Sequence, residues 1–387
     1  MFCFETGVER KKTNCEKWDA PFVGENVIPM WVADMDFEIA PNITRRLVKT
    51  AEQGAFGYQF LSDDYYNAII DFLRERHDYQ VKKEWICYVP NVVLGLFLAL
   101  QAVSQKEDEV IIQTPVYGPF YRVVEESERK LVENPLKCQN GYYTIDFEDL
   151  ERKITKRTKV LLFCNPHNPS GRVWKRKELE KLVQICVQNN ICIISDDIHS
   201  DIVSRNMKHT MIAEICKAKK GNCITATSPS KPFNLAGIHV ANFIIENAVI
   251  RKKFQRLLRI HHVDECNAFA EQALIGAYKE SAAWLNEMNA YVEENICYFV
   301  EYIQKNIPLL QTRKPEGTYL VWVDFRKTTV SPENLKDYLK ERCHVLINEG
   351  EFFGREGRGF ARFNLACPRK NIEIVLENLR KEFAKDF

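Results

Sequence analysis

Short runs of apolar residues alternate with helical patterns from about residue 67 onward. The segments 67–76 (NAIIDFLRER) and 177–187 (KELEKLVQICV) carry apolar residues at helical spacing. Continuous apolar runs lie at 110–113, 160–164, 191–194, 223–227 and 240–245. Such runs, separated by helices, are typical of a mostly parallel sheet that is covered on both faces. The pattern therefore predicts an α/β fold.

The pattern changes after about residue 285. A long helical pattern covers 291–306, and a second covers 332–342. Strand-like runs lie at 318–324 and 360–365, and a closing helix is expected to reach Phe387. We expect an N-terminal segment 1–45 that belongs to a smaller domain, a large domain 46–285, and a small α+β domain 286–387.

The composition is that of a globular protein and argues against several classes of function. Hydrophobic residues make up 45% of the 387 residues, and 54 Lys and Arg balance 53 Asp and Glu, so nucleic acid is not an expected partner. The longest apolar stretch, 92–100, is far shorter than the roughly 20 residues that span a bilayer, and we expect no membrane association. No secretory signal is visible, and the 13 cysteines form no CxxC pair, which indicates a cytoplasmic protein with reduced thiols.

Four polar strings lie at the ends of predicted strands, where parallel sheets bind ligands. They are NPHNPSGR at 165–172, SDDIH at 195–199, SPSKPFN at 228–234 and RFNL at 362–365. Each has an ordinary explanation alone, because Asn-Pro starts turns, Asp caps helices, and a single Lys or Arg is usually solvated or paired. Their combination in this order and spacing indicates a functional site.

This combination resembles the fold-type-I enzymes that use pyridoxal 5′-phosphate (PLP), in the class I and II aminotransferase superfamily, over essentially the whole chain. The resemblance implies a seven-stranded, mostly parallel sheet between helices, with a smaller α+β domain. It implies that Lys231 holds PLP as a Schiff base and then serves as the catalytic base. Asp196 would keep the pyridine nitrogen protonated, and Asn168 would bind the 3-oxygen of the ring and help to seat the substrate carboxylate.

The same resemblance assigns the remaining contacts. Arg362 would clamp the substrate carboxylate through two hydrogen bonds, and Tyr117 would stack on the cofactor ring. The phosphate would accept from the backbone N–H groups of Val92 and Val93, where a helix begins, and from the hydroxyl of Ser228.

A narrower resemblance is to the cystathionine β-lyase group typified by MalY and PatB. The strings that carry it are KWD at 17–19, PMWVADMDF at 29–37 and FGY at 56–58. His199 occupies a position where aspartate-type aminotransferases have a Tyr that bonds the 3-oxygen, and His239 replaces their phosphate-binding Arg. Asp197 departs from the group, in which a Glu is expected. Tyr58 resembles the tyrosine that group members lend to the neighbouring subunit's phosphate, which implies a homodimer.

The resemblance implies a carbon–sulfur β-lyase that converts L-cystathionine or a related cysteine S-conjugate to a thiol, pyruvate and ammonia. Two alternatives stay open: an aminotransferase that acts on an L-amino acid, and a PLP-binding regulatory protein without turnover. The glycine-rich string 354–359 is not GxGxxG and predicts a mobile loop near the substrate entrance. His261 and His262 lack further ligands at metal spacing, so we expect no metal.

Overall fold

The computed structural model describes residues 2–384, and its centre is a sheet of seven strands. In spatial order these are β2 (Ile86–Val89), β10 (Ala241–Ile245), β9 (Cys223–Thr227), β8 (Cys192–Asp196), β7 (Thr158–Cys164), β3 (Glu109–Ile112) and β4 (Lys130–Glu133). β10 runs antiparallel to both of its neighbours, and the other neighbouring pairs are parallel. The predicted α/β fold with a mostly parallel seven-stranded sheet is confirmed.

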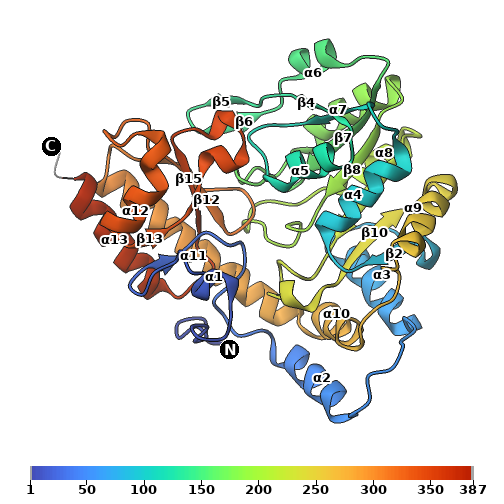
Figure 1. Ribbon diagram of the computed structural model, residues 1–387, viewed down its shortest axis with the longest axis horizontal. Helices are drawn as coiled ribbons and strands as arrows, with labels where there is room; N and C mark the ends of the chain where they lie inside the picture. The colour runs from blue at the N-terminus through green and yellow to red at the C-terminus, as the bar shows by residue number, and fades with distance from the viewer. Residues whose placement is uncertain (1, 385–387) are drawn as a thin grey trace.

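Helices cover both faces of this sheet (Figure 1). α4 (Val92–Val103), α5 (Pro119–Glu126) and α9 (Ala248–Ile260) share one apolar core with it, and α7 (Arg176–Gln188) and α8 (Ile212–Ala218) share another. Alternate residues of each strand point into the two cores, which explains why the strands are apolar throughout. α4 approaches β10 most closely at Gly95, where a Cβ atom would lie 2.0 Å from a ring carbon of Phe243, so only glycine fits.

The C-terminal part is a smaller unit on four antiparallel strands. Their order is β11 (Gln311–Thr312), β12 (Leu320–Asp324), β15 (Phe360–Asn364) and β14 (Asn348–Glu349). Its helices are α11 (Ala282–Asn306), α12 (Leu335–Cys343) and α13 (Arg369–Phe383). Near the N-terminus, β1 (Ile28–Pro29) pairs in parallel with β13 (Val345–Leu346), which places the first residues beside this unit (Figure 1).

The remaining elements connect these parts. They are α1 (Glu16–Asp19), α2 (Pro41–Glu52), α3 (Asp63–His77), α6 (Phe147–Lys153), α10 (Ala268–Glu280), the hairpin β5 (Lys137–Gln139) and β6 (Tyr142–Thr144), and 3-10 helices at Lys83–Trp85, Ala236–Ile238, Pro332–Asn334, Gly350–Phe353 and Arg355–Gly357. α2 and α3 both contact α10, and the chain between them, residues 53–62, runs as an extended arm along the outside (Figure 1).

Most predicted elements lie within a few residues of the observed ones, with three differences. α11 begins at Ala282, nine residues before the expected helix and ahead of the expected domain boundary, so the division of the chain into domains stays a prediction. The glycine-rich string 354–359 includes the one-turn helix Arg355–Gly357. The closing helix ends at Phe383, and its expected last residues, 385–387, lie outside the described part. None of the helices within residues 2–384 combines the length and the apolar character that a bilayer crossing requires.

Candidate active site

The carboxyl ends of three neighbouring strands bring the predicted polar strings to one edge of the sheet. Cys164 at the end of β7 pairs with Asp196 at the end of β8, which in turn pairs with Ala226 near the end of β9. Residues that follow these strands therefore start from the same level of the sheet. The strings 165–172, 195–199 and 228–234 lie together for this reason.

Lys231 lies at the centre of this edge. Its side-chain amine donates a hydrogen bond of 2.8 Å to the backbone carbonyl oxygen of Ala33, and the residue is half-buried. Burial lowers the pKa of Lys231, and the positive charge of Arg362 lowers it further, whereas Asp34 and Asp196 oppose this shift. Lys231 therefore gives up its proton more readily than an exposed lysine, as a nucleophilic amine must.

Asp196 is buried at the end of β8, with 3% of its surface exposed. The backbone N–H of Ile198 donates to its Oδ1 at 3.2 Å. Burial raises the pKa of Asp196 to about 7, and the neighbouring carboxylate of Asp197 also raises it, while the Ile198 N–H and Lys231 oppose the shift. Asp196 is therefore a carboxyl group whose charge depends on whether a cation lies against it.

Arg362 comes to the site from β15 of the smaller unit, and it is buried. Its Nη1 donates to Oδ1 of Asn168 at 3.1 Å, and its Nη2 donates to the carbonyl of Trp31 at 2.7 Å and to Oδ1 of Asn348 at 2.8 Å. The guanidinium lies over the ring of Phe353, 4.9 Å from its centroid. Burial lowers the pKa of Arg362 to about 10, so the group remains a cation at neutral pH.

Asn168 and Tyr117 are joined through the backbone. The carbonyl oxygen of Asn168 accepts a hydrogen bond of 3.1 Å from the N–H of Tyr117. Burial raises the pKa of Tyr117, which is half-buried. The positive charge of Arg362 opposes this rise in pKa, and the negative charge of Asp196 adds to it. Tyr117, Asn168, Arg362, Asp196 and Lys231 thus form one interacting cluster.

His199 belongs to the same cluster and is buried, with 3% exposed. Burial lowers the pKa of His199 well below its usual range, and the charges of Lys231 and Arg362 lower it further, so the ring is neutral at physiological pH. Its Nδ1 is buried without a hydrogen-bond partner in the described part of the chain. The ring meets Tyr319 edge to face at 5.9 Å between centroids.

The residues expected to bind the phosphate lie in the first turn of α4 and just after the end of β9. The side chain of Asn91 accepts from the N–H of Leu94 and caps α4, leaving the N–H groups of Val92 and Val93 in its first turn. The hydroxyl of Ser228 donates to the carbonyl of Val240 at 2.6 Å and accepts from the N–H of Ser230 at 3.0 Å. The Ser228 hydroxyl proton is therefore engaged by a backbone carbonyl.

Tyr58 and His239 lie away from the cluster in the single chain. Tyr58 is 95% exposed in the arm 53–62. His239 is exposed and adopts a left-handed backbone conformation with φ of 59°, and its carbonyl accepts from the hydroxyl of Tyr88 at 3.1 Å. A single chain therefore gives neither side chain a contact with Lys231.

The segment 31–37 contributes to the site mainly through its backbone, which sequence analysis did not predict. The carbonyl of Ala33 accepts from Lys231 and also from the hydroxyl of Tyr319, each at 2.8 Å. The side-chain amide of Asn364 donates to the carbonyls of Val32 and Asp34 at 2.6 Å. The family resemblance of the string PMWVADMDF pointed to this segment. The residue types could not show that its backbone carbonyl oxygens contribute to the site, because every residue has one.

A buried ion network fixes this segment from behind. The amine of Lys17 lies 2.9 Å from Oδ2 of Asp36 and 3.5 Å from Oδ1 of Asp34, and only 1% of its side chain is exposed. Arg10 pairs with Asp34 at 2.7 Å, and the indole N–H of Trp18 donates to Asp36 at 2.9 Å. Lys17 and Trp18 of the KWD string thus help to hold the segment 31–36, whereas Asp19 accepts from the backbone N–H groups of Lys12, Thr13 and Cys15.

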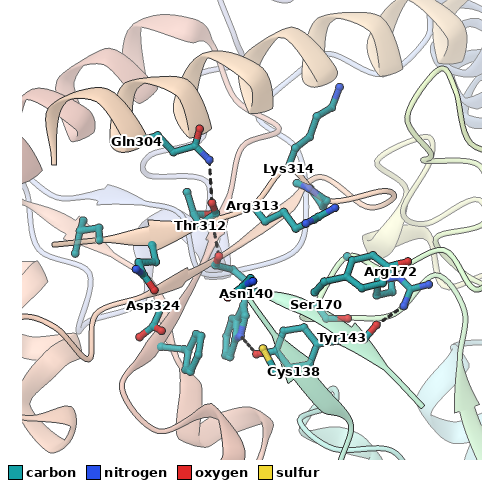
Figure 2. Close-up of a pocket in the computed structure, with 18 of the residues that line it drawn as sticks. Cys138, Asn140, Tyr143, Ser170, Arg172, Gln304, Thr312, Arg313, Lys314 and Asp324 are labelled. Carbon is teal, nitrogen blue, oxygen red and sulfur yellow. Dashed lines mark hydrogen bonds between the residues drawn. The ribbon is translucent and has the colours of Figure 1, made fainter. Parts of the chain in front are cut away.

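A hollow of about 660 Å³ lies between the hairpin β5–β6 and strands β11 and β12 (Figure 2). Figure 2 shows Arg172 bonded to the carbonyl of Tyr143 at its wall. Arg172 is also paired with Glu178 and Glu316, and Lys314 with Glu293. The predicted site residues do not line this hollow. Its cations Arg172 and Lys314 are held in ion pairs with glutamates.

Comparisons with known proteins identify the family of this chain. Residues 25–379 match the sequence model of the family described as Aminotransferase class I and II. Cystathionine beta-lyase PatB of Bacillus subtilis is 35% identical, with 97% of this chain and 98% of PatB covered. Protein MalY of Escherichia coli is 31% identical, with 96% of each covered. The crystal structure of cystalysin from Treponema denticola, which contains pyridoxal 5′-phosphate, has a TM-score of 0.95 at 35% identity and covers 100% of this chain and 99% of its own. The chain therefore belongs to the class I and II aminotransferase family, in the branch that contains PatB and MalY.

Proposed function

We propose that this chain is a PLP-dependent carbon–sulfur β-lyase, which releases a thiol, pyruvate and ammonia from L-cystathionine or a related cysteine S-conjugate. The observation that carries the proposal is the meeting of Lys231, Asp196 and Arg362 at one edge of the sheet, each with a pKa moved by burial. The similarity to PatB over nearly the full length of both chains supports the choice of reaction.

The residues at this edge fit PLP. Nδ1 of His199 and Nε of Arg362 are buried without hydrogen-bond partners among residues 2–384, so both nitrogens are available to a bound molecule. The lowered pKa of Lys231 suits an amine that condenses with an aldehyde. The first turn of α4 offers backbone N–H groups to a phosphate, and Ser228 would turn its hydroxyl away from Val240 to join them.

Each residue then has a definite task. PLP, when bound, supplies a ring that accepts the negative charge developing at the substrate Cα. Lys231 would hold the cofactor, and its amine would take the proton from the substrate Cα. Asp196 holds a proton on the pyridine nitrogen, because a cation against a buried carboxyl lowers its pKa and keeps it ionised. Tyr117 would pack on the cofactor ring, and His199 and Asn168 would bind its 3-oxygen.

Arg362 binds the substrate carboxylate and fixes the Cα–H bond toward Lys231. Its two Nη atoms already have acceptors on Asn168, Trp31 and Asn348, which hold the guanidinium plane, and Nε remains free. Asn168 can release its Oδ1 from Arg362 when a carboxylate arrives and offer its amide N–H groups instead. Orientation of this kind supplies much of the rate enhancement in enzymes.

The enzyme acts, in this proposal, as a homodimer in which Tyr58 serves the neighbouring subunit. Phe56, Tyr58 and Phe60 are 57%, 95% and 97% exposed close together on the arm 53–62, and exposed apolar side chains that gather in this way mark protein–protein contacts. The arm runs along the outside of the molecule between α2 and α3 (Figure 1). A phosphate site with few cations of its own would gain the Tyr58 hydroxyl from the second subunit.

The free cysteine thiols of this chain favour a cytoplasmic location. All 13 cysteines are free, and eight of them lie in the buried cores, where they act as small apolar side chains: Cys87, Cys164, Cys186, Cys192, Cys216, Cys266, Cys343 and Cys367. Free thiols persist in reducing compartments.

A paired assay on the PLP-saturated protein tests the reaction. L-cystathionine is added without any 2-oxo acid, and pyruvate and free thiol are followed together. Equal amounts of both over many turnovers are expected. A single turnover without pyruvate, which leaves the cofactor in its amine form, would instead identify an aminotransferase. PLP binding without either change would identify a binding protein without turnover.

Mixed dimers test the role of Tyr58. Lys231→Ala and Tyr58→Ala proteins, each weakly active or inactive alone, are unfolded together and refolded as a mixture. If Tyr58 acts across the interface, hybrid dimers contain one site with both residues intact, and activity returns. If Tyr58 acts within its own chain, no hybrid site is intact and the mixture stays inactive.

A further inference from the structure

The buried guanidinium of Arg362 has only uncharged partners in the described part of the chain. The residue is 3% exposed, and its Nη atoms donate to Oδ1 of Asn168 at 3.1 Å, to the carbonyl of Trp31 at 2.7 Å and to Oδ1 of Asn348 at 2.8 Å. No carboxylate among residues 2–384 pairs with it, although a buried charge is costly unless an opposite charge or hydrogen bonds compensate it. The protein therefore leaves the positive charge of Arg362 without a counterion.

Arg172 shows how the same chain compensates another buried arginine. It is 2% exposed, and its guanidinium pairs with Glu178 at 2.9 Å and with Glu316 at 2.8 Å. The two arginines are almost equally buried, but of the two only Arg172 has carboxylates beside it. The missing counterion is thus a property of the position of Arg362 and not of every buried arginine in this fold.

Asn348 occupies a place beside Arg362 that a carboxylate could take. It lies on β14, directly opposite Arg362 on the antiparallel strand β15. Side chains of directly opposite residues project from the same face of a sheet, so these two meet at 2.8 Å. Arginine can only donate, so the atom that faces it is the amide oxygen of Asn348. An aspartate would place an oxygen at the same distance from the backbone and would add a negative charge.

We propose that Asn348 is a positioning residue that makes the site selective for ligands with a carboxylate: its uncharged amide holds Arg362 in place and leaves the positive charge of Arg362 for the ligand. This inference rests on the proposed function, which assigns the substrate carboxylate to Arg362. An aspartate at this position would also hold Arg362, but it would neutralise the guanidinium and repel a second carboxylate. Selectivity is a difference between two affinities, so it is lost when the affinity for the carboxylate ligand alone falls.

The test compares Asn348→Asp with the unchanged protein, both saturated with PLP. Two ligands are used that differ only in the carboxylate, L-alanine and ethylamine, and each Kd is measured from the change in absorbance of bound PLP. In Asn348→Asp we expect the Kd of L-alanine to rise at least about tenfold, because its carboxylate meets a neutralised Arg362. The Kd of ethylamine should stay the same or fall, because a negative charge does not oppose a cation.

Two further variants separate charge from disturbance of the site. Asn348→Ser keeps an uncharged side chain that can accept a hydrogen bond, and L-alanine should bind within about threefold of its original affinity. Asn286→Asp is the matched control, because Oδ1 of Asn286 accepts from Nη1 of Arg76 at 3.2 Å on the surface. It places the same new carboxylate beside an arginine and should alter neither Kd.

The outcomes decide the inference directly. An Asn348→Asp protein that binds L-alanine as tightly as the unchanged protein would overturn it, and so would an equal weakening of both ligands, which would show a purely structural role. A loss in Asn348→Ser as large as that in Asn348→Asp would overturn the role of charge. If Asn348→Asp does not fold, Asn348→Ala decides: Arg362 loses one acceptor, so L-alanine should bind about threefold more weakly with ethylamine unaffected, and an unaltered Kd of L-alanine would overturn the inference.

Failure of the proposed function has a different signature. An unchanged protein that prefers L-alanine to ethylamine, but releases no pyruvate from L-cystathionine, would overturn the proposed reaction and leave the role of Asn348 standing. An unchanged protein without any preference for L-alanine would overturn the inference, even if pyruvate is formed.

Discussion

The side-chain amine of Lys231 and the hydroxyl of Tyr319 donate to the same acceptor, the carbonyl oxygen of Ala33, each at 2.8 Å. The three residues come from different parts of the chain, with Ala33 198 positions before Lys231 and 286 before Tyr319. Tyr319 is fully buried, and burial raises its pKa, so it remains a hydrogen-bond donor throughout the physiological range. Tyr319 therefore fixes the carbonyl that directs the Lys231 amine.

Removal of the Tyr319 hydroxyl should slow proton transfer more than binding. In Tyr319→Phe the Ala33 carbonyl loses its second donor, and the Lys231 amine loses part of its orientation toward the substrate Cα. We expect kcat to fall about tenfold with KM and PLP affinity nearly unchanged. Steady-state kinetics with L-cystathionine measure this. Tyr338→Phe, which removes a hydroxyl bonded to Glu382, is the matched control and should leave kcat unaltered.

Arg362 should not tolerate replacement by lysine. A lysine cannot make the fork of hydrogen bonds that joins Arg362 to Trp31, Asn348 and Asn168, nor bind a carboxylate through two donors. We expect Arg362→Lys to lower kcat/KM about 100-fold, mainly through a higher KM. Arg326→Lys alters another forked pair, with Asp324 at the surface, and serves as the control. A kcat/KM loss that is equal in both variants would contradict the assignment of Arg362 to the substrate.

Asp196 should make the cofactor-free protein less stable as the pH rises. The unfolded carboxyl ionises near pH 3.9, whereas burial raises the folded pKa to about 7. Between these values the unfolded state loses its proton first, and this ionisation lowers its free energy relative to the folded state. Asp196→Asn removes this penalty. Its unfolding free energy, relative to the unchanged protein, should therefore rise by about 3 kcal/mol between pH 5 and pH 8.

Urea unfolding of both cofactor-free proteins at the two pH values measures this difference. Asp264→Asn, at an exposed position, is the matched control for removal of a carboxylate at the surface. A relative stability of Asp196→Asn that stays constant from pH 5 to pH 8 would mean that the folded carboxyl ionises in the usual range.

Lys17 should be required for stability. Replacement by methionine removes the amine that pairs with both Asp34 and Asp36. The two carboxylates then keep less positive charge beside them to balance their negative charge in a buried site. We expect Lys17→Met to lower the unfolding free energy by about 3 to 5 kcal/mol, measured by urea unfolding. Lys83→Met breaks an ion pair with Asp63 at the surface and should leave the stability unchanged within error. Equal stability of Lys17→Met and the unchanged protein would show that Arg10 alone balances both carboxylates.

The sequence by itself determined the sheet and the residues at its carboxyl edge. Apolar runs and helical spacing are local properties, and they located β3, β7, β8, β9 and α7 to within about two residues. Parallel strands end at one edge, so the strings after 164, 194 and 227 had to meet there. The reversal of β10 was not visible, because it depends on the 3-10 helix Ala236–Ile238 replacing a full crossover helix between β9 and β10.

Only the tertiary structure decided which atoms complete the site. Ala33 contributes a carbonyl oxygen, which every residue has, and its partners lie far away in the sequence. Asp197 and His209 formed no pattern, because their contact depends on how the loop before α8 folds back onto the strand ends. Residue types and their spacing carry the chemistry of side chains. Backbone acceptors and contacts between distant segments arise from chain folding, so they became visible only when the segments lay together.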